Sequence, residues 1–274
     1  MNNTFAPALS LERVSKDFGS RQALRNVSLG MHPGEFVAVI GRSGAGKTTF
    51  LRCLACFTPV TAGAIRFRGQ DLAALAGAGL RAHRSRVGMI YQQFNLVRRL
   101  PVLYNVLVGR LGHLGPAARW AALAYRFPAG DREIALRCLD HVGLLDRAWQ
   151  RTDTLSGGEQ QRVAIAKILA QEPELILADE PIASLDLHNG ELVMGTLRAI
   201  AHEAGLPVVA TLHHVDFARR YADRVLGFQS GQLIFDGPAA DLTDGVLQEI
   251  FGDRLEADAS PLPLALGALE LVPS

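Results

Sequence analysis

The 274-residue sequence has few cysteines and almost no net charge. Its three cysteines are too few, and odd in number, for a disulfide framework, which favours a reducing compartment. The formal net charge of +1 gives no overall basic surface for a nucleic acid or an anionic membrane, so any such partner must be bound locally, and no nucleic-acid partner is expected. These shortages exclude small disulfide-stabilised secreted domains and strongly basic nucleic-acid-binding proteins.

The chain also lacks long hydrophobic runs. No segment approaches the roughly 18 consecutive apolar residues that a membrane-spanning helix requires. Residues 117–127, for example, are interrupted by Arg119 and Arg126. The first ten residues lack the basic and apolar regions of a signal peptide. With 49% hydrophobic and 20% charged residues, the composition predicts a soluble globular protein with a sizeable core.

Against these absences stands one complete phosphate-binding pattern, G-x-x-x-x-G-K-S/T, at residues 41–48. Its members are Gly41, Arg42, Ser43, Gly44, Ala45, Gly46, Lys47 and Thr48. The glycines let backbone N–H groups point at phosphate oxygens, Lys47 adds a positive charge, and Thr48 offers a hydroxyl to Mg²⁺. The pattern lies between a predicted strand at 35–40 and a predicted helix at 49–57. A glycine-rich turn without a ligand is the alternative, but the chain has only three lysines and one completes the pattern.

A second helix start, at residues 155–162, has two interpretations. Ser156 and Glu159 have capping-box spacing, which predicts a well-capped helix. Ser156, Gly157 and Gly158 also form an anion site of exposed N–H groups at the positive end of a helix. The chain has two such helix starts but only one phosphate-binding loop with a lysine. The second helix start is therefore expected to bind a nucleotide held by another molecule.

Two predicted strands deliver titratable groups to one sheet edge. The strand at 174–178 ends in Asp179 and Glu180, and the strand at 206–212 precedes His213 and His214. Asp179 fits the Mg²⁺-side acid of a phosphate-loop enzyme, and Glu180 can reach a water in line with the γ-phosphorus. The alternatives are that one acid caps the next turn and that the histidines are structural.

Other segments predict the architecture. Strands at 9–14 and 25–31 indicate an antiparallel lobe, with Phe18 on the intervening loop, where it stacks on an adenine or anchors the loop. Helical periodicity runs from 95 to about 153. Cys53 and Cys56 are expected one turn apart on the helix after the phosphate loop, as core thiols. The buried stripe predicted within the helical part comprises Ile134, Leu136, Leu139, Val142, Leu144 and Leu145.

Six motifs together resemble the ATP-binding subunit of ABC transporters. They are residues 41–48, Gln92, 155–159, 177–180, 183–186 and His213. The resemblance implies an α/β P-loop NTPase core, the ABC ATPase fold, with an antiparallel β lobe and an inserted helical subdomain. The ABC domain would span 9–252, with the helical subdomain at about 95–170, followed by a C-terminal tail at 253–274.

The resemblance also implies a role for each matching residue. Glu180 is the catalytic carboxylate, His213 the switch histidine and Gln92 the residue that senses Mg²⁺ and the attacking water. Phe18 stacks on the adenine, Thr49 follows the phosphate loop, and Ser184 and Asp186 belong to the D-loop. Magnesium would be held by Thr48, Gln92 and Asp179. ATP would lie between Lys47 of one copy and Ser156, Gly157 and Gly158 of a second copy.

A narrower resemblance is to the ATP-binding subunit of phosphonate importers. It rests on residues 92–97, the long insertion at 109–130, and residues 178–186 and 211–213. It implies integral membrane permease partners, a periplasmic or lipid-anchored substrate-binding protein and a peripheral location on the cytoplasmic face of the inner membrane. Arg42, Leu187 and His214 depart from the usual residues, without placing ATP binding in doubt.

Other functions remain open on the sequence. The same ATPase could serve an importer or exporter of another cargo. A DNA-repair or chromosome-associated ATPase shares the motifs but inserts a very long coiled coil, whereas only about a hundred residues intervene here, without sustained heptads. A translation-factor relative would need two nucleotide domains in one chain.

Overall fold

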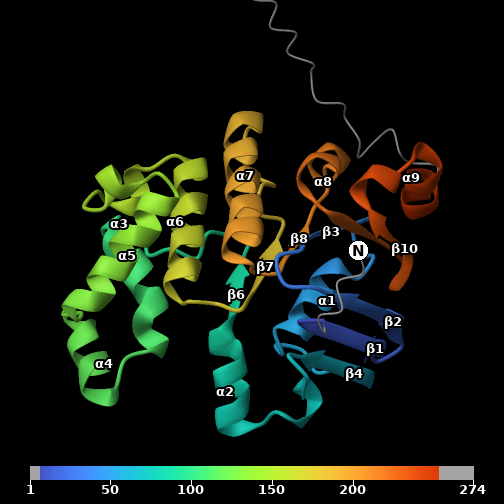
Figure 1. Ribbon diagram of the computed structural model, residues 1–274, viewed down its shortest axis with the longest axis horizontal. Coiled ribbons are helices and arrows are strands. Elements are labelled where there is room, and N and C mark those ends of the chain that lie inside the picture. The colour runs from blue at the N-terminus through green and yellow to red at the C-terminus, as the bar shows by residue number, and fades with distance from the viewer. Residues whose placement is uncertain (1–6, 253–274) are drawn as a thin grey trace, which may run out of the picture.

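The computed structural model describes residues 7–252 as a small β lobe, a larger sheet with helices, and a group of helices at one side (Figure 1). The lobe is a four-stranded antiparallel sheet in the order β2-β1-β4-β5. Its strands are β1 (Leu9–Phe18), β2 (Arg21–Met31), β4 (Ala62–Phe67) and β5 (Gln70–Asp71). The predicted antiparallel lobe is confirmed. The expected loop position of Phe18 is wrong, because Phe18 is the last residue of β1 and pairs with Arg21.

The larger sheet has six strands in the order β10-β9-β3-β8-β7-β6. These are β3 (Phe36–Gly41), β6 (Val87–Ile90), β7 (Leu175–Asp179), β8 (Val208–Thr211), β9 (Arg224–Gln229) and β10 (Gln232–Pro238). All neighbours pair in parallel except β9 and β10, which form an antiparallel hairpin. The carboxyl ends of β3, β7 and β8 therefore bring Gly41, Asp179 and Thr211 to one edge.

The alternation of side chains along β3 explains why the sheet is covered on both faces. Val37 and Val39 belong to the core shared with the β lobe and α1 (Lys47–Leu54). Phe36, Ala38 and Ile40 belong to the core shared with the helices of the other face. Because successive side chains of a strand point to opposite faces, one continuous apolar strand supports both cores.

Helices of the α/β part flank the sheet. They are α2 (Gly77–Arg86), α7 (Leu187–Ala204), α8 (Val215–Tyr221) and α9 (Asp244–Phe251), with short 3₁₀ turns at Leu72–Ala74 and Ala239–Asp241. The prediction that α1 reaches residue 57 is wrong, because the helix ends at Leu54. Cys53 is buried in it, whereas Cys56 lies beyond its end with φ +54°. The predicted tail after residue 252 lies outside the described residues.

The helical group at the left of Figure 1 contains α3 (Val102–Leu107), α4 (Pro116–Leu123), α5 (Ala129–His141) and α6 (Gly157–Ala170). Short 3₁₀ turns occur at Val108–Gly112, Leu145–Arg147 and Thr152–Thr154. Within the predicted stripe Leu139, Val142 and Leu144 are buried. Leu145 was expected in the stripe but is 44% exposed, because it begins a 3₁₀ turn after α5 has ended.

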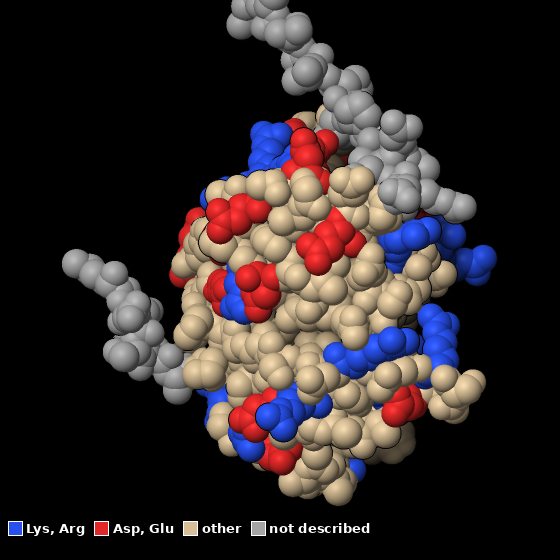
Figure 2. All heavy atoms as spheres, turned by 90° about the vertical axis from the view of Figure 1, so that its right-hand side faces the viewer, with Lys and Arg blue, Asp and Glu red and all other residues tan. Residues whose placement is uncertain are grey.

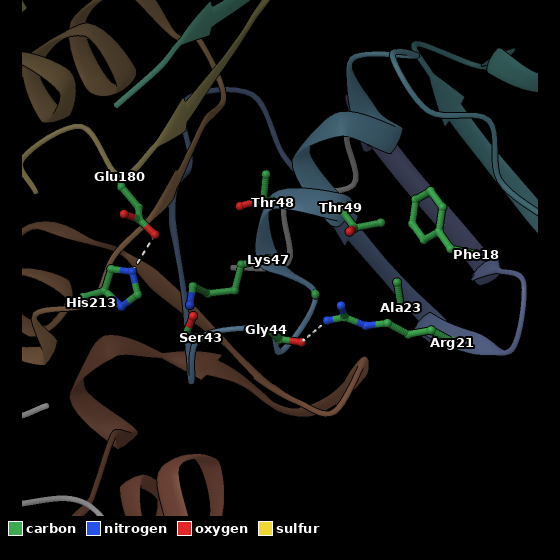
Figure 3. A pocket seen from close by; sticks show the side chains of 11 residues that line it. Phe18, Arg21, Ala23, Ser43, Gly44, Lys47, Thr48, Thr49, Glu180 and His213 are labelled. Carbon is green, nitrogen blue, oxygen red and sulfur yellow. Dashed lines mark hydrogen bonds and ion pairs between the residues drawn. The ribbon is translucent and has the colours of Figure 1, made fainter. Parts of the chain in front are cut away.

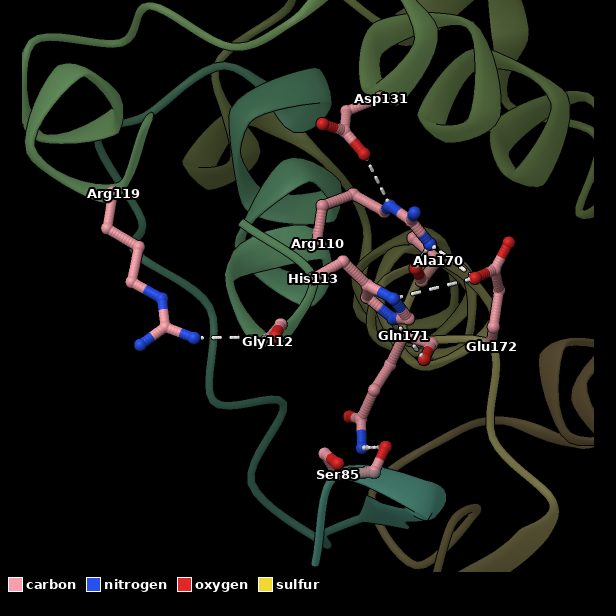
Figure 4. Close-up of polar contacts among 9 residues, drawn as sticks. All are labelled: Ser85, Arg110, Gly112, His113, Arg119, Asp131, Ala170, Gln171 and Glu172. Carbon is pink, nitrogen blue, oxygen red and sulfur yellow. Dashed lines mark hydrogen bonds and ion pairs between the residues drawn. The ribbon is translucent and has the colours of Figure 1, made fainter. Parts of the chain in front are cut away.

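A buried arginine ties this helical group together (Figure 4). The Arg110 side chain is 7% exposed and donates hydrogen bonds to Asp131 Oδ1 at 2.8 Å and to the Ala170 carbonyl at 2.9 Å. Its guanidinium also lies 2.9 Å from Glu172 Oε2. Burial opposes the charge, but the bonds to Asp131 and Glu172 outweigh it and raise the pKa of Arg110. Arg110 thereby links α5 to the end of α6.

A second buried side chain holds the segment that follows Gln92. Asn105 of α3 accepts from the Val97 N–H at 2.7 Å and donates to Thr152 Oγ1 at 2.9 Å. The Thr152 hydroxyl in turn donates to the Leu100 carbonyl at 2.9 Å. Because Thr152 lies just before α6, this network joins the segment at 97–100 to the start of that helix.

None of the described helices is both long and apolar enough to cross a membrane. The face with β1, β2 and α9 carries acidic and basic side chains interspersed over a mostly uncharged surface (Figure 2). This face therefore has no single-sign field that would attract a polyanion.

Candidate nucleotide site

The phosphate loop connects β3 to α1, as predicted. A Cβ at Gly41 would lie 2.2 Å from the Phe228 carbonyl oxygen, and one at Gly46 would lie 2.5 Å from the Ala23 carbonyl oxygen. Both glycines have positive φ, +144° and +108°. Only glycine fits these positions, because the loop passes directly over neighbouring backbone. The close fit sets the loop's backbone path at the start of α1.

Lys47, the first residue of α1, is only 6% exposed. Its Nζ donates to the Gly41 carbonyl at 2.6 Å and to the Arg42 carbonyl at 3.2 Å. The ammonium group therefore lies against the loop that wraps around it. A charge held this way beside the N-terminal N–H groups of a helix makes a strong local site for an anion.

A cavity of about 400 Å³ opens over the loop and extends to the β lobe (Figure 3). Glu180 and His213 lie at one end and Phe18 with Arg21 at the other, with Lys47 between them. The cavity is lined by Phe18, Arg21, Ala23, Ser43, Gly44, Gly46, Lys47, Thr48, Thr49, Glu180 and His213. Its polar middle and aromatic end match a phosphorylated ligand that carries a planar ring.

Asp179 and Thr211 meet because β7 and β8 pair in register at these two residues. Asp179 Oδ1 accepts from the Thr211 hydroxyl at 2.8 Å and from the Thr48 hydroxyl at 3.2 Å. Thr211 Oγ1 also accepts from the Glu180 N–H at 2.9 Å. One buried hydroxyl therefore fixes the positions of both acids.

Glu180 follows β7 with φ +52°, which is unusual for a residue other than glycine. Its Oε1 lies 2.5 Å from His213 Nε2. His213 follows β8 by two residues, so the contact joins the segments that leave two neighbouring strands at the cavity wall. A backbone strained in this way at a cavity wall is typical of functional positions.

The oxygen donors near Lys47 suit magnesium. Among the described residues no group of three or more His, Cys, Asp or Glu side chains could hold a metal. Thr48 and Asp179 instead supply one hydroxyl and one carboxylate, 3.2 Å apart. Mg²⁺ is commonly held by one or two protein oxygens together with substrate phosphates and water, so this donor set fits it.

Some predicted residues lie away from the cavity. Gln92 and Arg42 are exposed and do not line it. Ala45 is buried, and its carbonyl accepts from the Gly231 N–H at 2.9 Å.

The helix end at Ser156, Gly157 and Gly158 also lies outside the cavity. The predicted capping box is present: Ser156 accepts from the Glu159 N–H, and Glu159 accepts from the Ser156 N–H at 2.8 Å. The latter bond holds the pKa of the Glu159 carboxyl below its ordinary value. Ser156 and Gly157 are exposed, so a ligand of another molecule can reach this end.

Arg21, Ala23 and Thr211 were not predicted for the site. Arg21 Nη2 donates to the Gly44 carbonyl at 3.4 Å, which places it along the cavity wall beside the phosphate loop. Ala23 and Arg21 come from β2, and only the packing of the lobe against the loop reveals them. Thr211 could have been found from sequence by aligning the ends of the two predicted strands.

Comparison with known proteins decides the family. The sequence profile described as "ABC transporter" matches residues 24–183, more than half of the chain. The chain belongs to the ABC transporter family. As an ABC ATPase it binds ATP, and the predicted P-loop NTPase fold is confirmed.

Named relatives cover almost the whole length of this ABC ATPase. The "Phosphonates import ATP-binding protein PhnC" of Rhodopseudomonas palustris (strain BisB5) is 49% identical over 95% of this chain and 96% of its own length. The "Phosphonates import ATP-binding protein PhnC 3" of Nostoc sp. (strain PCC 7120 / SAG 25.82 / UTEX 2576) is 46% identical over 93% and 96%.

Among solved structures, the dimeric ATP-binding cassette MJ0796, in a post-hydrolysis state bound to ADP and Pi, superposes with a TM-score of 0.72. It is 33% identical and the match covers 84% of this chain and 98% of that one.

Proposed function

We propose that the chain is the ATP-hydrolysing subunit of a membrane importer that takes up a phosphonate or a related oxyanion through a separate permease. The observation that supports the ATPase assignment is that Lys47, Thr48 and Glu180 line the same cavity. The cargo is supported by full-length relatives that are named for phosphonate import.

In the proposed complex, the β- and γ-phosphates of ATP lie on the loop N–H groups and on Lys47. Phe18, 51% exposed at the other end of the cavity, stacks on the adenine. Lys16 Nζ lies over one face of the Phe18 ring, 4.9 Å from its centre. Thr49, which also lines the cavity, contacts the phosphates from the first turn of α1.

Thr48 and Asp179 would hold Mg²⁺, with Gln92 reaching it after the segment that carries Gln92 moves inward. When bound, the ion neutralises negative charge on the phosphate oxygens. Glu180 accepts a proton from the attacking water while the water oxygen forms a bond to the γ-phosphorus. At the same time the bond between the γ-phosphorus and the bridging oxygen of the β-phosphate breaks, which releases ADP. His213 orients the Glu180 carboxylate through the contact at its Oε1.

A second copy would complete each site. The exposed Ser156 and Gly157, with the N–H groups at the start of α6, would bind the γ-phosphate of the partner's ATP. The similar cassette MJ0796 is dimeric, which supports this arrangement. An isolated copy is then expected to bind ATP but to hydrolyse it slowly.

The chain would act at the cytoplasmic face of the inner membrane, bound to permease subunits that receive cargo from a periplasmic or lipid-anchored binding protein. The ABC domain would comprise residues 9–252, and its helical subdomain, about 95–170, would pass the motion to the permease. The Asn105 network supports this role, because it makes the segment at 97–100 move together with the start of α6.

The test is growth of a strain that lacks its own importer, expressing this chain with its permease and binding protein, on a phosphonate as the sole phosphorus source. Growth is expected with the wild type and not with Lys47→Ala. Growth on phosphate but never on any phosphonate, with the chain still hydrolysing ATP, would leave the ATPase assignment intact and overturn the cargo.

A further inference from the structure

The sequence between Asp71 and Asp131 contains no aspartate or glutamate, although it spans 59 residues. At the average density of the chain, about six acidic residues would fall there. The same stretch contains eight arginines. In sequence, the near-neutral chain therefore carries one basic segment, which includes both α2 and α4, although its Arg86 and Arg110 pair with acidic residues from outside it.

Helix α4 presents its apolar side chains to solvent. Trp120 is 75% exposed and Leu123 is 72% exposed, the highest values among the large apolar side chains of the described residues. They lie three positions apart, on one face of the helix, while Ala122 is buried on the opposite side. The helix therefore packs against the rest of the protein through Ala122, and its large apolar side chains face solvent.

Arginines border this apolar face. Arg119 precedes Trp120, and its guanidinium donates to the Leu111 carbonyl at 3.2 Å and to the Gly112 carbonyl at 3.4 Å. Figure 4 shows the second of these bonds. Arg126 follows the helix and is exposed. No acidic residue occurs between them to pair with either charge.

The position of α4 in the fold leaves this face open. In Figure 1, α4 lies at the lower left tip of the helical group, and α2 from the same acid-free stretch lies along the same lower edge. Helix α9 lies at the opposite, upper end. Two helices of the basic segment, α2 and α4, therefore lie at the same end of the molecule.

We propose that α4 and its flanking arginines, residues 116–126, contact the surface of an anionic phospholipid bilayer. Trp120 and Leu123 insert at the level of the headgroups, and Arg119 and Arg126 pair with lipid phosphates. Charge selects this occupant, because a run of exposed tryptophan, leucine and arginine without acids complements an anionic leaflet. The contact rests on the proposed placement at a membrane, but does not depend on the cargo.

The chain offers a direct probe, because it has two tryptophans, Trp120 and Trp149. In full-length Trp149→Phe protein, all tryptophan emission comes from Trp120. We would titrate it, at low ionic strength and up to millimolar lipid, with vesicles of phosphatidylcholine containing about 30% phosphatidylglycerol with brominated acyl chains. Blue-shifted emission and quenching by bromine are expected, with at least about tenfold weaker partitioning into pure phosphatidylcholine.

Charge variants separate this contact from nonspecific attraction. Arg119→Gln with Arg126→Gln should weaken partitioning by about 20-fold, about fivefold for each charge. The matched control, Arg198→Gln with Arg219→Gln, removes the same charge from α7 and α8 and should change partitioning less than about twofold. ATP hydrolysis, measured in parallel without lipid, should be equal in all these proteins.

Unchanged Trp120 emission with anionic vesicles would overturn the proposal. A shift that requires permease in the vesicles would also overturn it, in favour of a protein partner. Loss of ATP hydrolysis in the parent protein would refute the proposed function, whereas the Trp120 signal would still report on the bilayer contact.

Discussion

Replacing Thr211 by valine removes one hydroxyl while preserving the shape of the side chain. Thr211 is fully buried and bonds both to the Asp179 carboxylate and to the Glu180 N–H. Without the hydroxyl, the Glu180 N–H loses its acceptor, at a cost of about 1–3 kcal/mol. The Asp179 carboxylate loses one hydrogen bond but keeps the one from the Thr48 hydroxyl, so this change costs less free energy. We expect the free energy of unfolding to fall by about 2–3 kcal/mol.

The same substitution should impair catalysis more than binding. Glu180 holds its left-handed backbone conformation next to this bond, and displacing a catalytic carboxylate by about 1 Å can cost about 10²-fold in rate. We expect kcat to fall by about 10- to 100-fold at saturating ATP and Mg²⁺. ATP affinity should change less than about threefold, because Lys47 and the loop remain intact.

The assays are phosphate release for turnover, a fluorescent ATP analogue for binding, and urea unfolding for stability. Thr211→Ser restores the hydroxyl and should keep kcat within about threefold of wild type. If Thr211→Val retained wild-type turnover and stability, the inference that this hydroxyl positions both acids would be refuted.

Three further substitutions test separate parts of the account. Lys47→Ala should weaken ATP binding at least about tenfold in equilibrium titrations, because it removes a buried charge from the phosphate site; unaltered affinity would contradict the placement of the phosphates. Arg110→Ala should lower the free energy of unfolding by about 3 kcal/mol, whereas Arg137→Ala, which breaks an exposed pair with Glu133, should cost less than about 0.5 kcal/mol; equal losses would refute the structural role of Arg110. Burial lowers the pKa of His83 below its ordinary 6.5. As the pH falls, the unfolded chain therefore binds a proton at His83 before the folded chain does. The free energy of unfolding should keep the full contribution of neutral His83 above about pH 6.5 and fall below that pH, less steeply in His83→Gln. If urea unfolding gave the same pH dependence of this free energy in wild type and His83→Gln, the prediction would be contradicted.

Most of the site was predictable because its residues are close in sequence or end predicted strands. Residues 41–48 form one continuous segment from the end of β3 to the first turn of α1, and Asp179, Glu180 and His213 lie at or just after the ends of apolar runs that the parallel sheet aligns. Arg21 could not be predicted, because it reaches the loop only through packing of the β lobe against α1. Gln92 matches its motif yet lies outside the cavity, since motif spacing does not specify where a residue that follows β6 lies relative to the phosphate loop.

The errors in the predicted elements have local causes. Periodicity extended the first helix to residue 57, but the chain turns at Cys56, which adopts a left-handed conformation that periodicity does not reveal. Phe18 is predicted on a loop between two strands, but its pairing with Arg21 extends β1 as far as Phe18. Leu145 continued an apolar pattern after α5 had ended at His141. Each error concerns a boundary, where tertiary contacts decide the outcome.

The central claim is that the chain hydrolyses ATP with Glu180 as the base that accepts the proton of the attacking water. The most direct measurement compares ATP turnover and ATP binding in wild type and Glu180→Gln. The account predicts turnover lower by about 10²–10⁴-fold with ATP binding preserved, as expected for loss of a general base. Near-normal turnover in Glu180→Gln would contradict it.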